Sequence, residues 1–377
     1  MRGIGSILRI FDSLSGIEPA EWDRLSCGQP FLNHAFLSAL EDSGCVSERT
    51  GWVPCFPTLW EGDDLVGAMP LYLKKHSMGE YVFDWAWAEA YHRHGLEYYP
   101  KLVSAVPFTP VPGPRLLASS PENRARLVAA ALDLARDVGA SGLHCLFPEE
   151  AQATEMASNG MMLRRGIQFH WRNSDYADFE DYLSAMSHDK RKKIRQERRK
   201  ARDAGITFER KTGSEITERE WHFFESCYRN TYREHLSTPY LNLDFFMRIA
   251  EAMPENLLMV VASREGRAIA AALDLFDEKR LYGRYWGAIE QHSGLHFETC
   301  YYQGLEFCIE RKIEVFEGGA QGAHKLARGF MPVQTWSAHW LAHPEFSRAV
   351  DDFLERESQG IAMHMAELEE AAPFRRV

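Results

Sequence analysis

The order of elements expected over residues 257–328 constrains the fold of this chain most strongly. The sequence predicts a strand, a tight turn, a second strand, another turn and a third strand. A helix, a short strand and a loop follow, and this loop contains Gly318, Gly319 and Gly322. A hairpin that continues through a third strand and a helix is typical of a mixed sheet with helices on its faces. We therefore expect the α/β (α+β) class.

The first half of the chain repeats this order about 200 residues earlier. Strands are expected at residues 56–60, 65–74 and 81–87, a helix after Ser120-Pro121, and a buried strand at 143–147. No repeat is visible residue by residue, so the duplication is one of topology. We expect two domains, residues 1–175 and 176–377, each with a mixed twisted sheet flanked by helices.

The charge of the chain is uneven. The net charge is −11, which argues against a general nucleic-acid binder. Residues 188–202, however, hold nine Lys or Arg and two Asp or Glu, a net charge of +7, so the other residues sum to −18. This segment predicts a helix on which Arg191, Arg195 and Arg199 hold phosphate, either of a small donor or of a tRNA acceptor end. The alternative is a solvated helix with internal ion pairs.

Composition also limits where the protein works. No run approaches the roughly 20 apolar residues that span a bilayer. The seven Cys are scattered and contain no C-x-x-C motif. We expect a cytoplasmic protein with reduced thiols and no membrane insertion, and the sequence does not decide its oligomeric state.

The loop from Gly318 to Phe330 is the strongest candidate site. Glycines let backbone N–H groups approach an anion closely, and Lys325 and Arg328 add positive charge beside them. In acyl transfer, a cation aimed at the developing oxyanion is usually the largest catalytic contribution. Lys325 is therefore expected to stabilise the oxyanion or a donor phosphate, with His324 as a candidate base. The alternative is an ordinary solvated loop.

Other polar residues are weaker candidates. Asp84 lies between Phe83 and Trp85 on an expected buried strand, where a raised pKa would suit a general base. Glu298 is either a base or an acid that is favoured at a helix N-terminus. His339 and His343 lie four residues apart without an evident third ligand, so no metal site is expected. We assign four side chains to a substrate cleft: Trp85, Glu89, Tyr285 and Trp286.

Long motifs resemble a known family. They include PLYLKKHSMGEYVFDWAWA (70–88), PFTPVPGPRLL (107–117), KRKKIRQERR (190–199), GRYWG (283–287), HFETCYYQGLEFCIE (296–310) and EGGAQGAHKLARGFMPVQTWSAHW (317–340). Together they cover nearly the whole chain. They resemble the Fem-like predicted N-acyltransferases of the GNAT superfamily. This family is usually described as one of peptidoglycan biosynthesis or recognition. The resemblance implies two tandem GNAT-like domains and transfer of an acyl group to an amine.

The resemblance also implies co-substrates and a catalytic lysine. Fem peptidyltransferases move an aminoacyl group from aminoacyl-tRNA to a peptidoglycan-precursor amine, helped by a Phe-Lys pair. Lys325 is the nearest match, although His324 replaces the Phe. The chain lacks the long helical arm of some Fem proteins and a clean acetyl-CoA signature, so acyl-CoA and aminoacyl-tRNA both stay open as donors. No tightly bound cofactor is implied, and the acceptor is a small-molecule or peptide amine. The rival interpretation is a non-catalytic protein that binds a cell-wall fragment or another anionic ligand.

Overall fold

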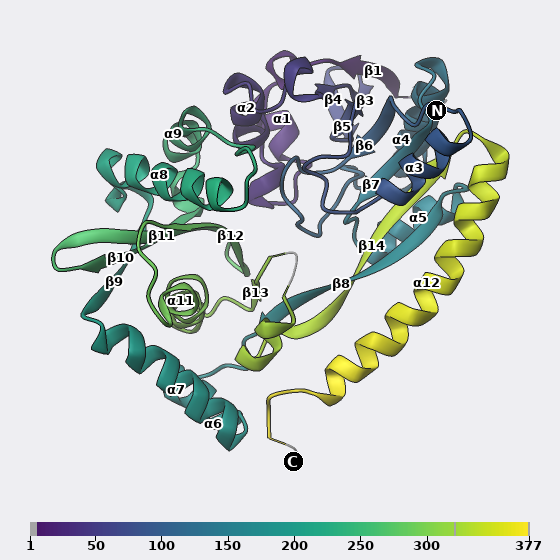
Figure 1. The fold of residues 1–377 in the computed structure, drawn as a ribbon. Helices are drawn as coiled ribbons and strands as arrows, with labels where there is room; N and C mark the ends of the chain where they lie inside the picture. The colour runs from purple at the N-terminus through teal and green to yellow at the C-terminus, as the bar shows by residue number, and fades with distance from the viewer. Residues whose placement is uncertain (1–5, 320–321, 376–377) are drawn as a thin grey trace. The chain divides into compact units, whose positions relative to one another are not determined.

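The computed structural model describes residues 6–319 and 322–375 (Figure 1). These residues form two compact units. The first contains the described residues up to Ile167 together with Gln334–His364, and the second contains Gln168–Val333 with the described residues from Met365 on. The expected boundary between residues 175 and 176 remains a prediction. The structure adds that residues 334–364 return to the first unit.

The main sheet of the first unit is mixed. Its strand order is β2 (Trp52–Pro54), β5 (Leu71–Lys74), β6 (Lys101–Ser104), β7 (Gly142–Leu146) and β14 (Met331–Leu341). The β6–β7 pair is parallel and the other pairs are antiparallel. A smaller antiparallel sheet contains β1 (Ile7–Phe11), β3 (Phe56–Glu61) and β4 (Asp64–Ala68). The helices of this unit are α1 (Pro19–Asp23), α2 (His34–Asp42), α3 (Trp85–Arg93), α4 (Pro121–Asp137) and α5 (Glu150–Ser158).

Two predictions for the first unit were wrong. The strand expected at 65–74 is two strands, β4 and β5, separated by Met69-Pro70, because proline has no N–H to donate to a ladder. The strand expected at 81–87 does not form, since Trp85 begins helix α3 and Asp84 is its N-cap residue. Trp87 and Tyr91 lie four apart and are both buried, which is a helical period. By contrast, α4 begins as predicted, with the Ser120 hydroxyl accepting from the N–H of Asn123.

The sheet of the second unit is also mixed. Its strand order is β8 (Met162–Arg172), β13 (Val315–Glu317), β12 (Arg280–Ala288), β11 (Arg267–Phe276), β10 (Leu257–Arg264) and β9 (Ile206–Thr212). The predicted hairpin and third strand are confirmed, since β10–β11 and β11–β12 are antiparallel. The β12–β13 pair is parallel, as a crossover through a helix requires. Each unit therefore confirms the expected mixed sheet with flanking helices.

The helices of the second unit carry most of its charged side chains. They are α6 (Phe179–Ala185), α7 (His188–Asp203), α8 (Glu218–Glu234), α9 (Leu243–Ala252), α10 (Leu295–Phe297) and α11 (Gln303–Arg311). Between α10 and α11 lies a π-helical turn, Glu298–Tyr302. On α7 the buried residues are Ile194 and Ala201, as the sequence indicated, while most of its cations are exposed.

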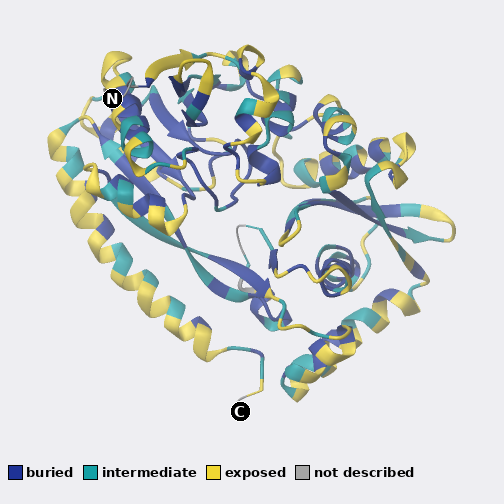
Figure 2. Cartoon of the chain, turned by 180° about the vertical axis from the view of Figure 1, so that it is seen from behind, coloured by how far each residue is buried: buried dark blue, intermediate teal, exposed yellow. Residues whose placement is uncertain are grey.

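The last helix, α12 (Pro344–Glu370), follows the return of the chain to the first unit. Figure 2 shows that most of its length is exposed, whereas the strands of the sheets are largely buried. Within residues 6–319 and 322–375, no helix combines the length and apolar composition needed to cross a bilayer.

Candidate functional site

The loop after β13 brings Lys325 close to the end of β12. Gly319 has a φ of +83°, and a Cβ built there would lie 3.5 Å from the Gly283 carbonyl oxygen and 3.9 Å from Lys325 Nζ. A glycine is therefore favoured here by its backbone conformation, whereas both distances are ordinary van der Waals contacts. Residues 320 and 321 lie outside the described residues. The chain then forms a 3-10 helix, Ala323–Arg328, which carries the candidate lysine.

Lys325 is buried without a countercharge. Only 2% of the residue is exposed, and Nζ donates a 3.0 Å hydrogen bond to the Gly319 carbonyl oxygen. In the part of the chain that the structure describes, no carboxylate forms an ion pair with this ammonium. Burial, and then the guanidinium of Arg284, lower the pKa of Lys325 to about 8. Among residues 6–319 and 322–375, Nζ has this one hydrogen-bond acceptor, whereas an ammonium has three N–H donors.

Histidine and aromatic rings surround this lysine segment. The Tyr301 hydroxyl lies 3.3 Å from Nε2 of His324, and the Tyr301 ring packs edge-on against Phe330. His296 packs against Trp286, with 5.1 Å between ring centroids, and against Tyr301. Burial, followed by the charges of His324 and Arg328, lowers the pKa of His296 to about 4. Burial, followed by the charges of Arg328 and Lys325, also lowers the pKa of His324. Both imidazoles are therefore neutral near pH 7 and able to accept a proton.

Asp274 is a buried acid of the second unit that the sequence analysis did not single out. It lies on β11, is 2% exposed, and its Oδ2 has no hydrogen-bond partner in the structure. Burial raises its pKa to about 8, although an N–H of Arg284 hydrogen bonds to the carboxyl group. A single acid within the apolar run AIAAALDLF was the signal that could have found it. Asp274 also acts electrostatically on Cys300, whose thiol pKa burial raises well above its usual value.

Glu298 lies in the same unit but is already paired. It is buried and accepts from Arg198 at 2.8 Å and from the Gln303 amide at 2.8 Å. Arg198 also binds Glu306 and stacks over Phe179. The hydrogen bonds from Arg198 and Gln303 stabilise the charged form of this carboxylate. The arrangement favours a structural role for Glu298 over the predicted role as a base.

Arg328 is likewise engaged. Its Nη2 lies 2.9 Å from both carboxylate oxygens of Glu197, and its Nη1 donates 2.7 Å to the His324 carbonyl oxygen. The guanidinium carbon lies 3.3 Å from the Phe297 ring centroid, and the residue is 3% exposed. These contacts favour a role within the protein over the predicted direct binding of phosphate.

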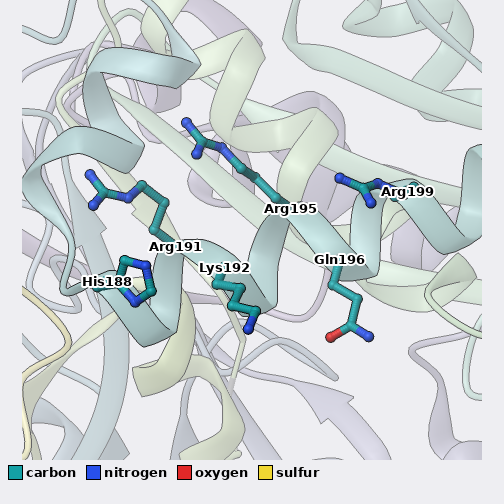
Figure 3. A pocket seen from close by; sticks show the side chains of 6 residues that line it. All are labelled: His188, Arg191, Lys192, Arg195, Gln196 and Arg199. Carbon is teal, nitrogen blue, oxygen red and sulfur yellow. The ribbon is translucent and has the colours of Figure 1, made fainter.

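The outer face of α7 holds the three predicted phosphate ligands together. Arg191, Arg195 and Arg199 line a hollow of about 570 Å³ (Figure 3). The hollow is also lined by His188, Lys192 and Gln196, so the described lining carries no carboxylate. Arg195 forms one ion pair with Glu180. The face is suited to an anion with several charges.

The remaining predicted residues belong elsewhere. Asp84 is in the first unit, where Lys101 donates to it and Tyr98 donates at 2.7 Å. Burial raises the pKa of Asp84, but the charges of Lys101 and His144 outweigh this and leave the pKa below its usual value. This arrangement does not suit a base with a raised pKa. Trp85 and Glu89 are exposed on α3, in the same unit.

The two predicted cleft residues of β12 have different surroundings. Trp286 packs against His296, next to the lysine segment, whereas Tyr285 packs against Tyr228 of α8 and Phe246 of α9. Successive side chains of a strand point to opposite faces, so only one of the two reaches this site.

The two histidines considered as metal ligands also have separate surroundings. His339, on β14, lies within hydrogen-bond distance of His144 and Ser337, at 2.9 and 2.8 Å. His343 instead packs against Phe346. In residues 6–319 and 322–375, no group of three or more His, Cys, Asp or Glu is arranged to hold a metal ion.

Comparison with solved structures shows the fold. FemX aligns with a TM-score of 0.55 at 10% identity, over 91% of this chain and all of FemX. The L-PGS structure from Bacillus licheniformis aligns with a TM-score of 0.50 at 11% identity, over 87% of this chain and 97% of that one. The C-terminal domain of a putative lysylphosphatidylglycerol synthetase from Agrobacterium fabrum has a TM-score of 0.48 at 13% identity, over 66% and 80% of the two chains.

The sequence itself gives the family. Among curated proteins, none matches the chain significantly. The family model FemAB-like, described as peptidoglycan biosynthesis/recognition, matches residues 13–376. The match spans nearly the whole sequence, so this chain belongs to the FemAB-like family.

Proposed function

We propose that this protein is an N-acyltransferase that moves an activated acyl or aminoacyl group onto an amine. Membership of the FemAB-like family and a fold shared with FemX support this class of reaction. The observation that carries the proposal is Lys325, a buried ammonium without a carboxylate partner in the described chain, beside a glycine-rich loop. Such a group is pre-organised to bind a developing negative charge.

The reaction requires few groups from the protein. The lone pair of a neutral amine attacks the carbonyl carbon of the donor, a C–N bond forms, and the carbonyl oxygen becomes an oxyanion. Lys325 donates an N–H to that oxygen. The carbonyl then re-forms and the bond to the leaving oxygen or sulfur breaks. The new amide nitrogen loses a proton to a base. The leaving group takes the bonding electrons and receives that proton from the base.

His324 is the base that the geometry supports best. It is exposed, precedes Lys325 directly, and has a lowered pKa. The neutral imidazole that results can take the proton that the new amide nitrogen loses, and Tyr301 orients one ring nitrogen. The other two predicted bases, Glu298 and Asp84, are held in ion pairs with Arg198 and Lys101.

The donor is the finer part of the proposal. Aminoacyl-tRNA and acyl-CoA both carry phosphate, and the outer face of α7 offers Arg191, Arg195 and Arg199 to either. Nucleic-acid binding would depend steeply on salt, because each neutralised phosphate releases counterions. An amine of a peptidoglycan precursor is the acceptor class that agrees with the family description.

The test is a transfer assay with purified protein. Acetyl-CoA, longer acyl-CoAs and charged tRNAs serve as donors, and a UDP-linked muropeptide serves as acceptor, with product read by mass. Lys325→Ala should lower the rate of transfer by about 10²–10³-fold, whereas Lys279→Ala, at an exposed lysine of the β11–β12 turn, should leave it unchanged. Equal rates in the two variants would contradict the role of Lys325. Ligand binding without turnover by any donor would instead support a binding protein.

A further inference from the structure

The segment that carries Lys325 lies between two glycines with positive φ. Gly322 has a φ of +122° and Gly329 a φ of +81°. Glycine restricts the backbone little, so these positions fix the orientation of the 3-10 helix weakly. Side-chain contacts must therefore hold the helix in place. The Tyr182 hydroxyl provides one such contact, donating 2.7 Å to the Arg328 carbonyl oxygen.

The Arg328 side chain provides the others. One guanidinium nitrogen binds Glu197 and another binds the His324 carbonyl oxygen. The guanidinium carbon also packs 3.3 Å from the centroid of the Phe297 ring. The contact of Arg328 with the His324 carbonyl closes the turn around Lys325. One buried cation thus joins both ends of the segment to α7.

The basic helix provides the matching acid. Glu197 is the one carboxylate between Asp189 and Asp203 in a helix with nine Lys or Arg. It accepts from Arg328 and from the Tyr302 hydroxyl of the π-helical turn. Its neighbour Arg198 is turned toward acids of the same region, Glu298 and Glu306. Adjacent residues of opposite charge thus fix α7 to the elements around Lys325.

We propose that Arg328 is a positioning residue that holds Lys325 in register with the basic helix through Glu197. This inference rests on the proposed function for its catalytic consequence. It replaces direct phosphate binding by Arg328. The anion-binding face of α7 and the lysine that meets the reacting carbonyl then belong to one rigid assembly in the second unit. Misplacement of a catalytic group by about 1 Å costs on the order of 10²-fold in rate.

The first test does not depend on any substrate. The reactivity of Lys325 toward trace acetic anhydride is followed by peptide mass spectrometry over a pH series. The parent protein should show a labelling midpoint near pH 8. In Arg328→Met the freed segment exposes Lys325 to water, so the midpoint should rise by about 1–2 pH units toward that of an ordinary lysine. Lys200→Met removes an exposed cation from α7, the helix that carries Glu197, and should leave the labelling midpoint of Lys325 unchanged.

The second test uses the transfer assay. Arg328→Met should lower kcat by about 10–100-fold with little change in KM for the donor. Glu197→Gln keeps the shape of the side chain that binds Arg328 and should lower kcat by a smaller factor. This milder variant tests the same contact if Arg328→Met does not fold. The charge-exchanged pair Glu197→Arg with Arg328→Glu should recover part of the activity lost in either single variant.

The outcomes separate the two proposals. An Arg328→Met protein that is folded and has an unchanged Lys325 labelling midpoint would overturn the positioning role, whatever the activity. A rise in KM for the donor with unchanged kcat would also overturn it, in favour of direct phosphate binding. If no donor supports transfer in the parent protein, the proposed function fails, while the labelling experiment still decides the positioning role.

Discussion

Both units bury lysine side chains, and Lys101 of the first unit and Lys325 of the second have opposite surroundings. In the first unit, Lys101 is fully buried and donates to Asp84 and, at 2.8 Å, to Glu80. Burial lowers the pKa of Lys101, but the charges of the two carboxylates outweigh it and raise the pKa above its ordinary value. In the second unit, burial and Arg284 act in the same direction and lower the pKa of Lys325 to about 8.

This difference separates a structural cation from a candidate catalytic one. The N–H donors of Lys101 already bind Asp84, Glu80 and the Ser77 hydroxyl. Lys325 has only a neutral carbonyl as its hydrogen-bond partner in the described chain, so an oxyanion would be its first negative partner. Burial alone therefore does not mark a functional lysine, and the charge of its partners does.

The largest expected effect is on stability in the first unit. Lys101→Met leaves Glu80 and Asp84 buried beside each other without their main cation. Breaking a buried ion pair in this way costs about 3–5 kcal/mol of unfolding free energy, measurable by urea denaturation. The neighbouring exposed pair gives the control, since Lys75→Met removes a solvent-screened partner of Glu48 and should leave the urea midpoint nearly unchanged. Similar losses in both variants would show that the Lys101 cluster is not a structural ion network.

The converse change should affect rate and spare the fold. Lys325→Ala should lower the rate of transfer by about 10²–10³-fold, the usual result of removing an oxyanion donor. Because Lys325 has no carboxylate partner in the described residues, no buried anion is left unpaired. Its urea midpoint should therefore lie near that of the parent. A large loss of unfolding free energy with little loss of rate would mean that Lys325, like Lys101, has a structural and not a catalytic role.

The pH dependence sharpens the comparison. Lys325 acts as an ammonium, so the rate should fall as pH rises above about 8, by about tenfold for each further unit. The rate falls, and does not rise, because the side chain of Lys325 loses its positive charge at high pH, and a neutral lysine stabilises an oxyanion poorly. Lys325→Arg keeps the charge and should move this limb to higher pH. An unchanged limb would assign the ionisation to another group.

The glycine beside Lys325 gives a smaller effect. Gly319→Ala places a Cβ at a φ of +83° and 3.9 Å from Lys325 Nζ. The backbone conformation alone should cost about 1–2 kcal/mol of unfolding free energy. Gly266→Ala, at a φ of +73° with nothing within 4 Å of the added Cβ, is the matched control. Only the Gly319 variant should also lower the rate of transfer, and equal rates would show that close approach to Lys325 does not matter.

The smallest effect on stability is expected on α7. Replacing Arg191, Arg195 and Arg199 together by Gln should change the unfolding free energy by about 0.5 kcal/mol or less for each site, because these side chains lie at the surface. The same variant should weaken donor binding and flatten its salt dependence. An unchanged salt slope, measured by titration at several salt concentrations, would remove this face from the donor site.

The sequence predicted the second unit better than the first. Short periodic strands separated by Gly and Asp turns define the β10–β11–β12 segment locally. In the first unit, the start of α4 was also predicted, because a local helix cap defines it. The raised pKa predicted for Asp84 was wrong because Lys101, a residue outside that segment, forms an ion pair with its buried carboxylate. The return of residues 334–364 to the first unit also depends on long-range packing.

The same reasoning applies to the candidate site. Lys325, His324 and the glycines could be named from one continuous loop. The engagement of Glu298 by Arg198 and of Arg328 by Glu197 could not, since these pairs are separated by about 100 residues or more. Asp274 could have been noticed as a single acid in an apolar strand, but its raised pKa comes from burial, which only the structure shows.

The central claim is that Lys325 is a buried ammonium without an anionic partner among the described residues, whereas the charge of Lys101 is balanced by Glu80 and Asp84. Carbon NMR of protein labelled at lysine Cε, with Lys325→Arg and Lys101→Arg used for assignment, titrates both groups in one sample. We predict that Lys325 titrates near pH 8 and that Lys101 titrates above the range of ordinary lysines. Titration of Lys325 at or above the ordinary value, together with Lys101, would contradict the account.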